Sequence, residues 1–125
     1  MADMLYICRH CGNIVGKIED SGVPVVCCGE EMQALKAANV DQGAEKHVPQ
    51  IKVSGTTVTV TVSTVAHPME ANHHISWILL QTKQGRQRKV LASGQKPEAV
   101  FALTPDDEVI KAFAYCNLHG LWASK

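Results

Sequence analysis

Polar and apolar side chains alternate with a period of two in the second half of the chain. Residues 57–63 show this strictly, because hydroxyl side chains occupy the odd positions and valines the even ones. A segment of this kind has one apolar face, as in a β-strand that is buried on one side. Residues 57–63 are therefore predicted to form a half-buried strand.

Further segments with strand character follow at short intervals, separated by turns that contain Gly, Pro or Asp. They are residues 75–80, 88–91, 99–103 and 109–116. Strict alternation in the last of them would place Ile110 on the same face as Ala112 and Cys116. Short strands joined in this way predict an all-β fold, an immunoglobulin-like antiparallel β-sandwich.

The chain is expected to change character near residue 37. Residues 29–46 favour a helix by composition, but Asn39, Asp41, Gln42 and Gly43 interrupt that tendency, so we expect at most one helical turn there. A chain of 125 residues can bury one moderate core and carry a small appendage. We therefore expect a small cysteine-rich module at residues 1–37 and a β-sandwich domain at residues 38–125.

Composition narrows the function classes. Twelve basic and twelve acidic residues give a net charge of zero, so no charge excess points to nucleic acid. The first residues lack the basic and apolar regions of a signal peptide, and no stretch approaches about 18 uninterrupted apolar residues. We expect a cytoplasmic protein that does not bind a membrane. In a reducing compartment, its five cysteines favour metal ligation over disulfides.

Four of the cysteines form a pattern typical of a metal site. Cys8 and Cys11 belong to a C-x-x-C-G turn, and Cys27 and Cys28 follow fifteen residues later and also precede a glycine. Adjacent cysteines on an extended strand point to opposite sides, so Cys27 and Cys28 can share an ion only if the backbone bends between them. The pattern predicts a four-thiolate site, and the ligands alone are compatible with zinc or iron.

A second group of soft ligands lies in the remainder of the chain. Cys116 and His119 are separated by two residues, and Gly120 allows the backbone to turn beside them. Upstream imidazoles at the edges of the predicted strands could converge on this pair, namely His47, His67 and at most one of the neighbours His73 and His74. This set is too large for a tetrahedral zinc site, and a blue-copper site would require an axial Met that the tail lacks.

Three segments, Glu45 to Pro49, His67 to Glu70 and Cys116 to Gly120, resemble the desulfoferrodoxin superoxide reductases, and the likeness spans the whole chain. The resemblance implies a desulforedoxin-like module in which one iron is bound by four thiolates. It also implies a second, catalytic iron with four imidazoles and an axial thiolate. The implied ligands are Cys8, Cys11, Cys27 and Cys28 for the first iron, and His47, His67, His73, His119 and Cys116 for the second.

The same resemblance implies the chemistry. A one-electron reduction of superoxide to hydrogen peroxide would use an external donor such as rubredoxin, and the chain would form a homodimer. Lys46 would attract superoxide and help to deliver protons. Glu45 would occupy the open iron position in the oxidised resting state.

Other functions compatible with the residues are a zinc-knuckle binding module with incidental histidines, a cupredoxin-like carrier built on Cys116, and an electron-transfer iron protein without catalysis. The visible absorption spectrum distinguishes zinc from iron, because zinc does not absorb visible light. Binding of azide or cyanide separates an open iron site from a closed one.

Overall fold

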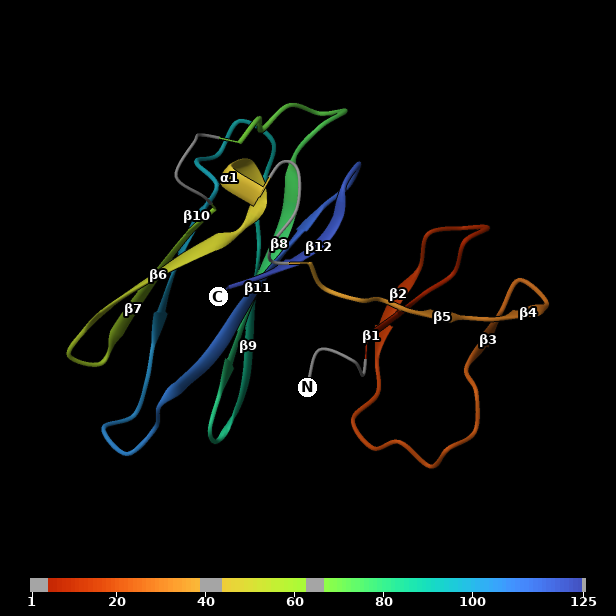
Figure 1. Ribbon diagram of the computed structural model, residues 1–125, viewed down its shortest axis with the longest axis horizontal. Coiled ribbons are helices and arrows are strands. Elements are labelled where there is room, and N and C mark those ends of the chain that lie inside the picture. Colours follow the sequence, from red (N-terminus) through yellow and green to blue (C-terminus); the bar gives the residue numbers. More distant parts are fainter. Residues whose placement is uncertain (1–4, 39–43, 63–66, 125) are drawn as a thin grey trace. The chain divides into compact units, whose positions relative to one another are not determined.

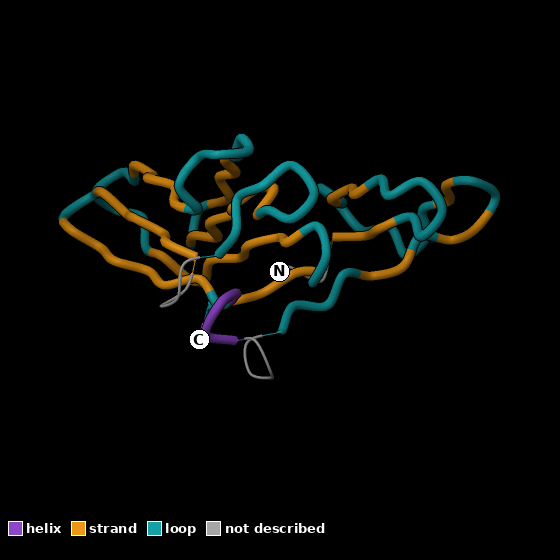
Figure 2. Tube along the Cα trace, turned by 90° about the horizontal axis from the view of Figure 1, so that it is seen from above, coloured by secondary structure: helices purple, strands orange, loops and turns teal. Residues whose placement is uncertain are grey.

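Strands dominate the computed structural model, which describes residues 5–38, 44–62 and 67–124. The chain divides into two compact units with a boundary between Lys36 and Ala37. Within the described residues the only helix is a single short turn (Figure 2). The prediction of an all-β fold is therefore confirmed. No helix in these ranges is long and apolar enough to cross a membrane.

The first unit contains five short strands. They are β1 (Leu5–Ile7), β2 (Ile14–Gly16), β3 (Val26–Cys27), β4 (Glu30–Glu31) and β5 (Gln33–Ala34). The strand order β2-β1-β5 makes a three-stranded antiparallel sheet, and β3 and β4 form a separate hairpin. Few apolar side chains are buried here besides Leu5, Ile7, Met32 and Leu35. A core of this size gives little stability, so the unit needs an additional constraint such as a metal.

The second unit is a sandwich of two antiparallel sheets, which Figure 1 shows together with the short helix at one end. One sheet has the order β10-β7-β6 and the other the order β12-β11-β8-β9. The elements are α1 (Ala44–His47), β6 (Pro49–Ser54), β7 (Thr57–Val62), β8 (Ile75–Thr82), β9 (Gly85–Val90), β10 (Glu98–Ala102), β11 (Val109–Cys116) and β12 (Gly120–Ala123).

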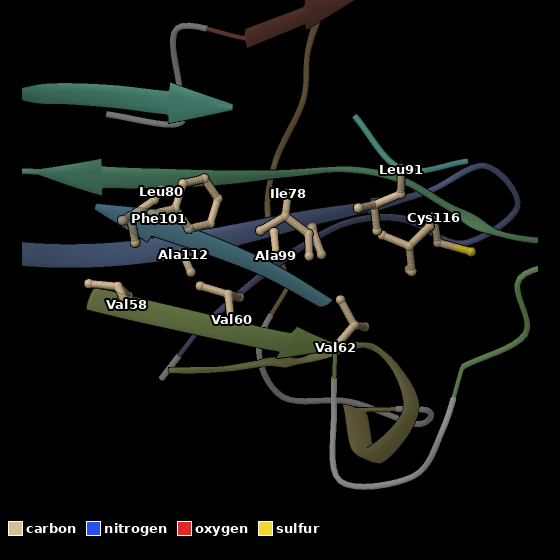
Figure 3. Close-up of a cluster of buried hydrophobic side chains, with 12 residues drawn as sticks. Val58, Val60, Val62, Ile78, Leu80, Leu91, Ala99, Phe101, Ala112 and Cys116 are labelled. Atoms are coloured by element: carbon tan, nitrogen blue, oxygen red, sulfur yellow. The ribbon is translucent and has the colours of Figure 1, made fainter. Parts of the chain in front are cut away.

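The core lies between these two sheets (Figure 3). Val58, Val60 and Val62 of β7 are almost completely buried, while the intervening threonines are partly exposed, as the alternation predicts. Phe101 of β10 and the inward residues of β8 and β11 complete the cluster. Cys116 is part of this cluster, and Figure 3 shows its sulfur directed away from the other core side chains.

The strand prediction was wrong about one face of β11. Ile110 is 56% exposed, whereas its neighbour Val109 packs against the core. The pairing of β11 with β8 shifts register between Val109 and Lys111, so the strict alternation is broken there. Ala112 and Cys116, which follow this irregularity in the strand, are buried in the core as predicted.

The segment that enters the second unit is attached to its last strand. The backbone of Ala38 accepts a hydrogen bond from Ala123 N at 2.7 Å and donates one to Leu121 O at 3.0 Å. These bonds place Ala38 beside Trp122 in a parallel bridge. After residues 39–43, which lie outside the described ranges, α1 leads into β6 and ends at His47.

Candidate metal centres

The four cysteines of the first unit come together as one group. Their sulfur atoms all lie within 4.8 Å of one another, and Cys11 Sγ is 3.6 Å from Cys27 Sγ. Sulfurs held about 2.3 Å from a tetrahedral ion would lie about 3.8 Å apart, so this spacing fits a four-thiolate metal ion. Cys8 is buried, whereas Cys11 and Cys28 are exposed.

The backbone bends where the two adjacent cysteines require it. Cys28 has a φ of +53°, the only positive φ of a non-glycine residue in the described ranges, and Gly29 follows with +77°. This left-handed pair turns the chain after β3, so both sulfurs can face the same side. The bend expected between Cys27 and Cys28 is thereby observed.

Ionisation of the cysteines also points to a bound cation. Backbone hydrogen bonds, with that of Cys11 the strongest, lower the pKa of the Cys8 thiol to about 6. In contrast, interactions with Cys11, then Cys8 and Cys27, raise the pKa of Cys28 to about 12. Neighbouring thiolates oppose one another's ionisation, and a metal ion bound by the four sulfurs would compensate their charge.

His10, which lies inside the first C-x-x-C turn, is not part of this group. Its Nε2 lies 3.1 Å from a carboxylate oxygen of Glu30, and both side chains are largely exposed. This contact joins the first cysteine turn to the strand that follows the second one. His10 is thus a surface residue.

A second group forms at the end of the sandwich where β8 begins and β11 ends. It consists of His47, His67, His73, Cys116 and His119, with one ligand atom of each within 4.8 Å of all the others. Each comes from the end of an element or from a turn: the end of α1, the segment before β8, the last residue of β11, and the turn before β12. Positions of this kind let a sandwich gather side chains from distant parts of the chain.

The four imidazoles form a closed ring. Ring centroids are separated by 4.7 Å for His47 and His67, 4.8 Å for His67 and His73, 5.1 Å for His73 and His119, and 4.8 Å for His119 and His47. Each pair meets edge to face, at 66° to 78°. His47 Nε2 and His119 Nδ1 are 3.2 Å apart. Nitrogens about 2.1 Å from one ion and at right angles to each other would be about 3.0 Å apart, so the spacing suits adjacent ligands.

The protonation state of His67 suits metal binding. Its Nδ1 lies 2.7 Å from the carbonyl oxygen of Pro68, which can only accept a hydrogen bond, so Nδ1 carries the proton and Nε2 has the free lone pair. Burial is the main cause that lowers the pKa of His67 to about 4, so the ring is neutral at pH 7. Hydrogen bonding at the second nitrogen is the usual way in which a protein orients a metal-binding imidazole.

Two buried nitrogens of the ring have no hydrogen-bond partner within the described residues. They are Nε2 of His67 and Nε2 of His73. Buried polar atoms in folded proteins are almost always paired, and an unpaired one costs stability. The two atoms belong to neighbouring imidazoles of the group of four, and a single metal ion would be a partner for both.

Cys116 provides the anionic ligand of this group. The residue is completely buried, and its sulfur is 3.6 Å from His119 Nδ1. His119 is exposed, so solvent reaches the ring from the side of this residue. Gly120, with a φ of +83°, makes the turn that the sequence predicted beside the pair.

Of the two adjacent histidines, His73 belongs to the group and His74 does not. His73 joins the ring, whereas the half-buried His74 contacts the carbonyl oxygen of Glu70 through Nδ1 at 2.9 Å. Lys46 is exposed and directly precedes His47 in α1. The side chain of Glu45 lies outside the part of the chain that the structure describes.

Sequence reasoning missed Trp122, which supports two of the imidazoles. Its ring stacks on His47 with centroids 4.8 Å apart and planes 16° from parallel. Its Nε1 donates a hydrogen bond to His119 O at 3.1 Å. Trp122 lies only three residues after His119, but a buried aromatic residue in a short strand gives no sign in the sequence that it stacks on a distant histidine.

Comparison with known proteins finds relatives that cover nearly the whole chain. A family model described as Desulfoferrodoxin matches residues 39–125. Desulfoferrodoxin from Nitratidesulfovibrio vulgaris is 44% identical over 121 residues, which are 97% of this chain and 94% of the relative. The solved superoxide reductase from Treponema pallidum is 39% identical with a TM-score of 0.80, over 98% of this chain and 96% of that chain. The superoxide reductase (1Fe-SOR) from Giardia intestinalis is 36% identical with a TM-score of 0.56, over 64% of this chain and 95% of its own.

The two ligand groups and the family together agree with the prediction of two mononuclear iron ions, one for the four thiolates and one for the four imidazoles and the thiolate. The two groups share no residue, and each lies in its own unit. The match to the family model covers more than half of the chain, and the identity to the N. vulgaris relative extends over nearly all of it. The chain therefore belongs to the desulfoferrodoxin family.

Proposed function

We propose that this protein is a superoxide reductase, which reduces superoxide to hydrogen peroxide with one electron from an external donor. In the net reaction, superoxide, one electron and two protons give hydrogen peroxide. The observation that carries the proposal is the closed ring of four imidazoles beside the buried sulfur of Cys116. The superoxide reductases from T. pallidum and G. intestinalis, which are similar to this chain, support the same reaction here.

Five protein ligands are suited to a metal that prefers six. Iron held by this set would supply a one-electron donor with one coordination position left for a small oxyanion. The imidazoles are neutral donors, so Cys116 provides the only negative charge among the five ligands. Because one thiolate does not neutralise a divalent or trivalent cation, the centre as a whole favours an anionic substrate.

Cys116 has a second role through its electron density. A thiolate ligand pushes electron density toward its metal and so favours electron transfer to a bound acceptor. Its complete burial keeps water away from the sulfur, so its charge is not screened by solvent. The exposure of His119 provides the side from which a small substrate can approach.

Two charged neighbours of His47 complete the proposed machinery. The exposed Lys46 would attract superoxide electrostatically and help to deliver protons through water. Glu45 is proposed from the family resemblance alone, as the group that fills the open position in the oxidised resting state. The assignment of the five metal ligands does not depend on either of these roles.

The remaining proposals concern the setting of the reaction. A small electron carrier such as rubredoxin would be the donor, the chain would act as a homodimer, and it would work in the cytoplasm. The first unit, at residues 1–37 in the expected division, would hold the four-thiolate iron as an auxiliary centre. The sandwich domain, residues 38–125, would carry the reaction.

A kinetic experiment tests the reaction. The iron-loaded protein, reduced chemically, is mixed with superoxide generated by pulse radiolysis, and both the decay of superoxide and the yield of peroxide are recorded. We expect one peroxide per superoxide and one oxidised His4Cys centre per turnover. A dismutase would instead yield one peroxide for two superoxide ions without net oxidation of the protein. Failure of azide and cyanide to change the spectrum would favour an electron-transfer protein, and a colourless protein rich in zinc would favour a binding module.

A further inference from the structure

The loop that carries His73 contacts a side chain from the turn that carries Cys116 and His119. Glu70 and His73 exchange backbone hydrogen bonds, with N to O distances of 2.9 and 3.2 Å. His74 follows and leads into β8. The tight turn defines the local shape of the loop, but these bonds lie within it and do not fix its position relative to the other ligands.

Asn117 supplies that connection. Its Oδ1 accepts a hydrogen bond from His74 N at 2.8 Å, and its Nδ2 donates one to Asn72 O at 3.0 Å. Its own backbone N donates to His74 O at 3.2 Å. The three bonds involve the two residues that flank His73 and leave the imidazole itself free to face the ring.

The position of Asn117 in the sequence gives these bonds a particular meaning. It directly follows Cys116 and precedes His119 by two residues, so it lies inside the turn that carries two other ligands. Its two side-chain partners, His74 and Asn72, lie 43 and 45 positions before it in the chain. The regular pairing of β11 with β8 is also interrupted between Tyr115 and Cys116. The Asn117 side chain therefore continues the connection where the strand ladder becomes irregular.

His73 depends on its backbone more than His67 does. The ring of His67 is oriented by the contact of its Nδ1 with Pro68 O. Within the described residues the structure shows no hydrogen bond to the ring of His73, whose Nε2 is buried without a partner. Its other ring contacts are with His67 and His119. The direction of the His73 ring thus follows from the direction of its loop.

From these contacts we propose that Asn117 is a positioning residue, which holds His73 at the correct distance from Cys116 and His119 before metal binds. Both ends of its amide are used in one orientation only, because Oδ1 faces an N–H group and Nδ2 faces a carbonyl oxygen. A ligand loop that is already in place loses less entropy when the ion binds. Asn117 therefore contributes to metal affinity without contacting the metal.

Variants of Asn117 separate this role from that of an ordinary turn residue. Asn117→Ala removes both side-chain bonds, whereas Asn117→Asp keeps an acceptor for His74 N and loses the donor to Asn72 O. The matched control is Gln84→Ala. Gln84 is likewise an exposed amide that joins distant segments, through bonds to Asp106 O and Oδ2, but it lies at the opposite end of β11 from Cys116.

The measurements are cobalt(II) titration and hydrogen exchange. Cobalt in a tetrahedral four-thiolate site absorbs more strongly than in a five-ligand site with one thiolate, so the two centres can be followed separately in the full chain. Changes in residues that orient a metal ligand typically weaken binding about 10- to 100-fold, and for Asn117→Ala we expect about tenfold at the His4Cys site only. Asn117→Asp should be intermediate, and Gln84→Ala should match the parent. The His74 amide should exchange faster in metal-free Asn117→Ala than in the metal-free parent.

Several results would overturn the proposal. They are unchanged cobalt affinity in Asn117→Ala, an equal loss in Gln84→Ala, and a His74 amide without protection in the metal-free parent. The last measurement needs no variant, so it decides the matter even if Asn117→Ala fails to fold. The inference rests on the metal site of the proposed function and not on its reaction. A parent that takes up no cobalt at the His4Cys site would defeat that site, whereas a parent that binds cobalt but does not react with superoxide would leave the role of Asn117 intact.

Discussion

Replacing His67 by Leu should have opposite effects on the metal-free and the metal-loaded protein. His67 is 4% exposed and has a buried Nε2 without a hydrogen-bond partner in the described residues. A buried polar atom that lacks a partner costs about 1–3 kcal/mol. Leu has a similar volume and no polar atom, so it removes this cost. It also removes the bond to Pro68 O, which is worth about 1 kcal/mol. Metal-free His67→Leu should therefore be as stable as the metal-free parent or more stable, by up to about 2 kcal/mol.

With metal bound, we expect the parent to be more stable than His67→Leu. A ligand that binds only the folded state stabilises it by about 4 kcal/mol when its free concentration is a thousand times the dissociation constant. His67→Leu loses one of five ligands and should lose most of this gain at the same metal concentration. The metal-loaded variant should therefore unfold at a lower urea concentration than the metal-loaded parent.

Tryptophan fluorescence during urea unfolding provides the assay, because Trp77 and Trp122 both lie in the second unit and report on it alone. The matched control is His74→Leu, which changes a half-buried histidine outside the ring of four imidazoles. We expect the control to lower the free energy of unfolding by about 1 kcal/mol or less, equally with and without metal, because it loses only the bond to Glu70 O. If metal-free His67→Leu were clearly less stable than the metal-free parent, His67 Nε2 would not be an uncompensated cost of the metal site.

Three further predictions concern the two centres. Cys11→Ser should lose the four-thiolate iron and keep the other; elemental analysis and the visible spectrum check this, and loss of both irons from a folded sandwich would contradict two independent sites. Lys46→Ala should slow the reaction with superoxide about tenfold or more and flatten its salt dependence, with Lys46→Arg retaining more of the rate. Pulse radiolysis at low and high salt is the measurement, and an alanine variant with unchanged rate and salt dependence would exclude Lys46 from the mechanism. A shortened chain that begins at Ala37 should still reduce superoxide with a chemical reductant, because all five ligands lie beyond that point; an iron-loaded but inactive truncation would make the first unit essential.

The sequence predicted the strands whose burial alternates regularly, and it failed where another contact decides the structure. β7 follows its pattern residue by residue. β6 was not predicted, because Pro49 reads as a turn signal, yet a proline is compatible with the first residue of an edge strand. β12 was also missed, because Leu121, Trp122 and Ala123 are all buried and show no alternation. Their place is determined by pairing with β11 and Ala38.

The ligand groups were accessible from the sequence because Cys and His are rare residues with a narrow chemical role. The residues that hold these ligands in place could not be predicted from the sequence. The side chain of Asn117 bonds to residues 43 and 45 positions away, and Trp122 stacks on the likewise distant His47; neither residue type predicts such a partner. The exposed position of Ile110 was equally hidden, because a shift of strand register leaves no mark in the order of apolar residues.

The ring of imidazoles also governs how the chain can come apart. His47 and His119 are 72 positions apart, so an ion bound by both closes a loop of that size, and a cross-link over such a loop removes about 4 kcal/mol of chain entropy from the unfolded state. Unlike a disulfide, this cross-link joins five positions at once and can be withdrawn by a chelator. The last strand and the helical turn cannot separate while the ion is held, so loss of metal and opening of that end should occur as a single slow event. The lifetime of the folded sandwich would then be governed by the rate of metal release.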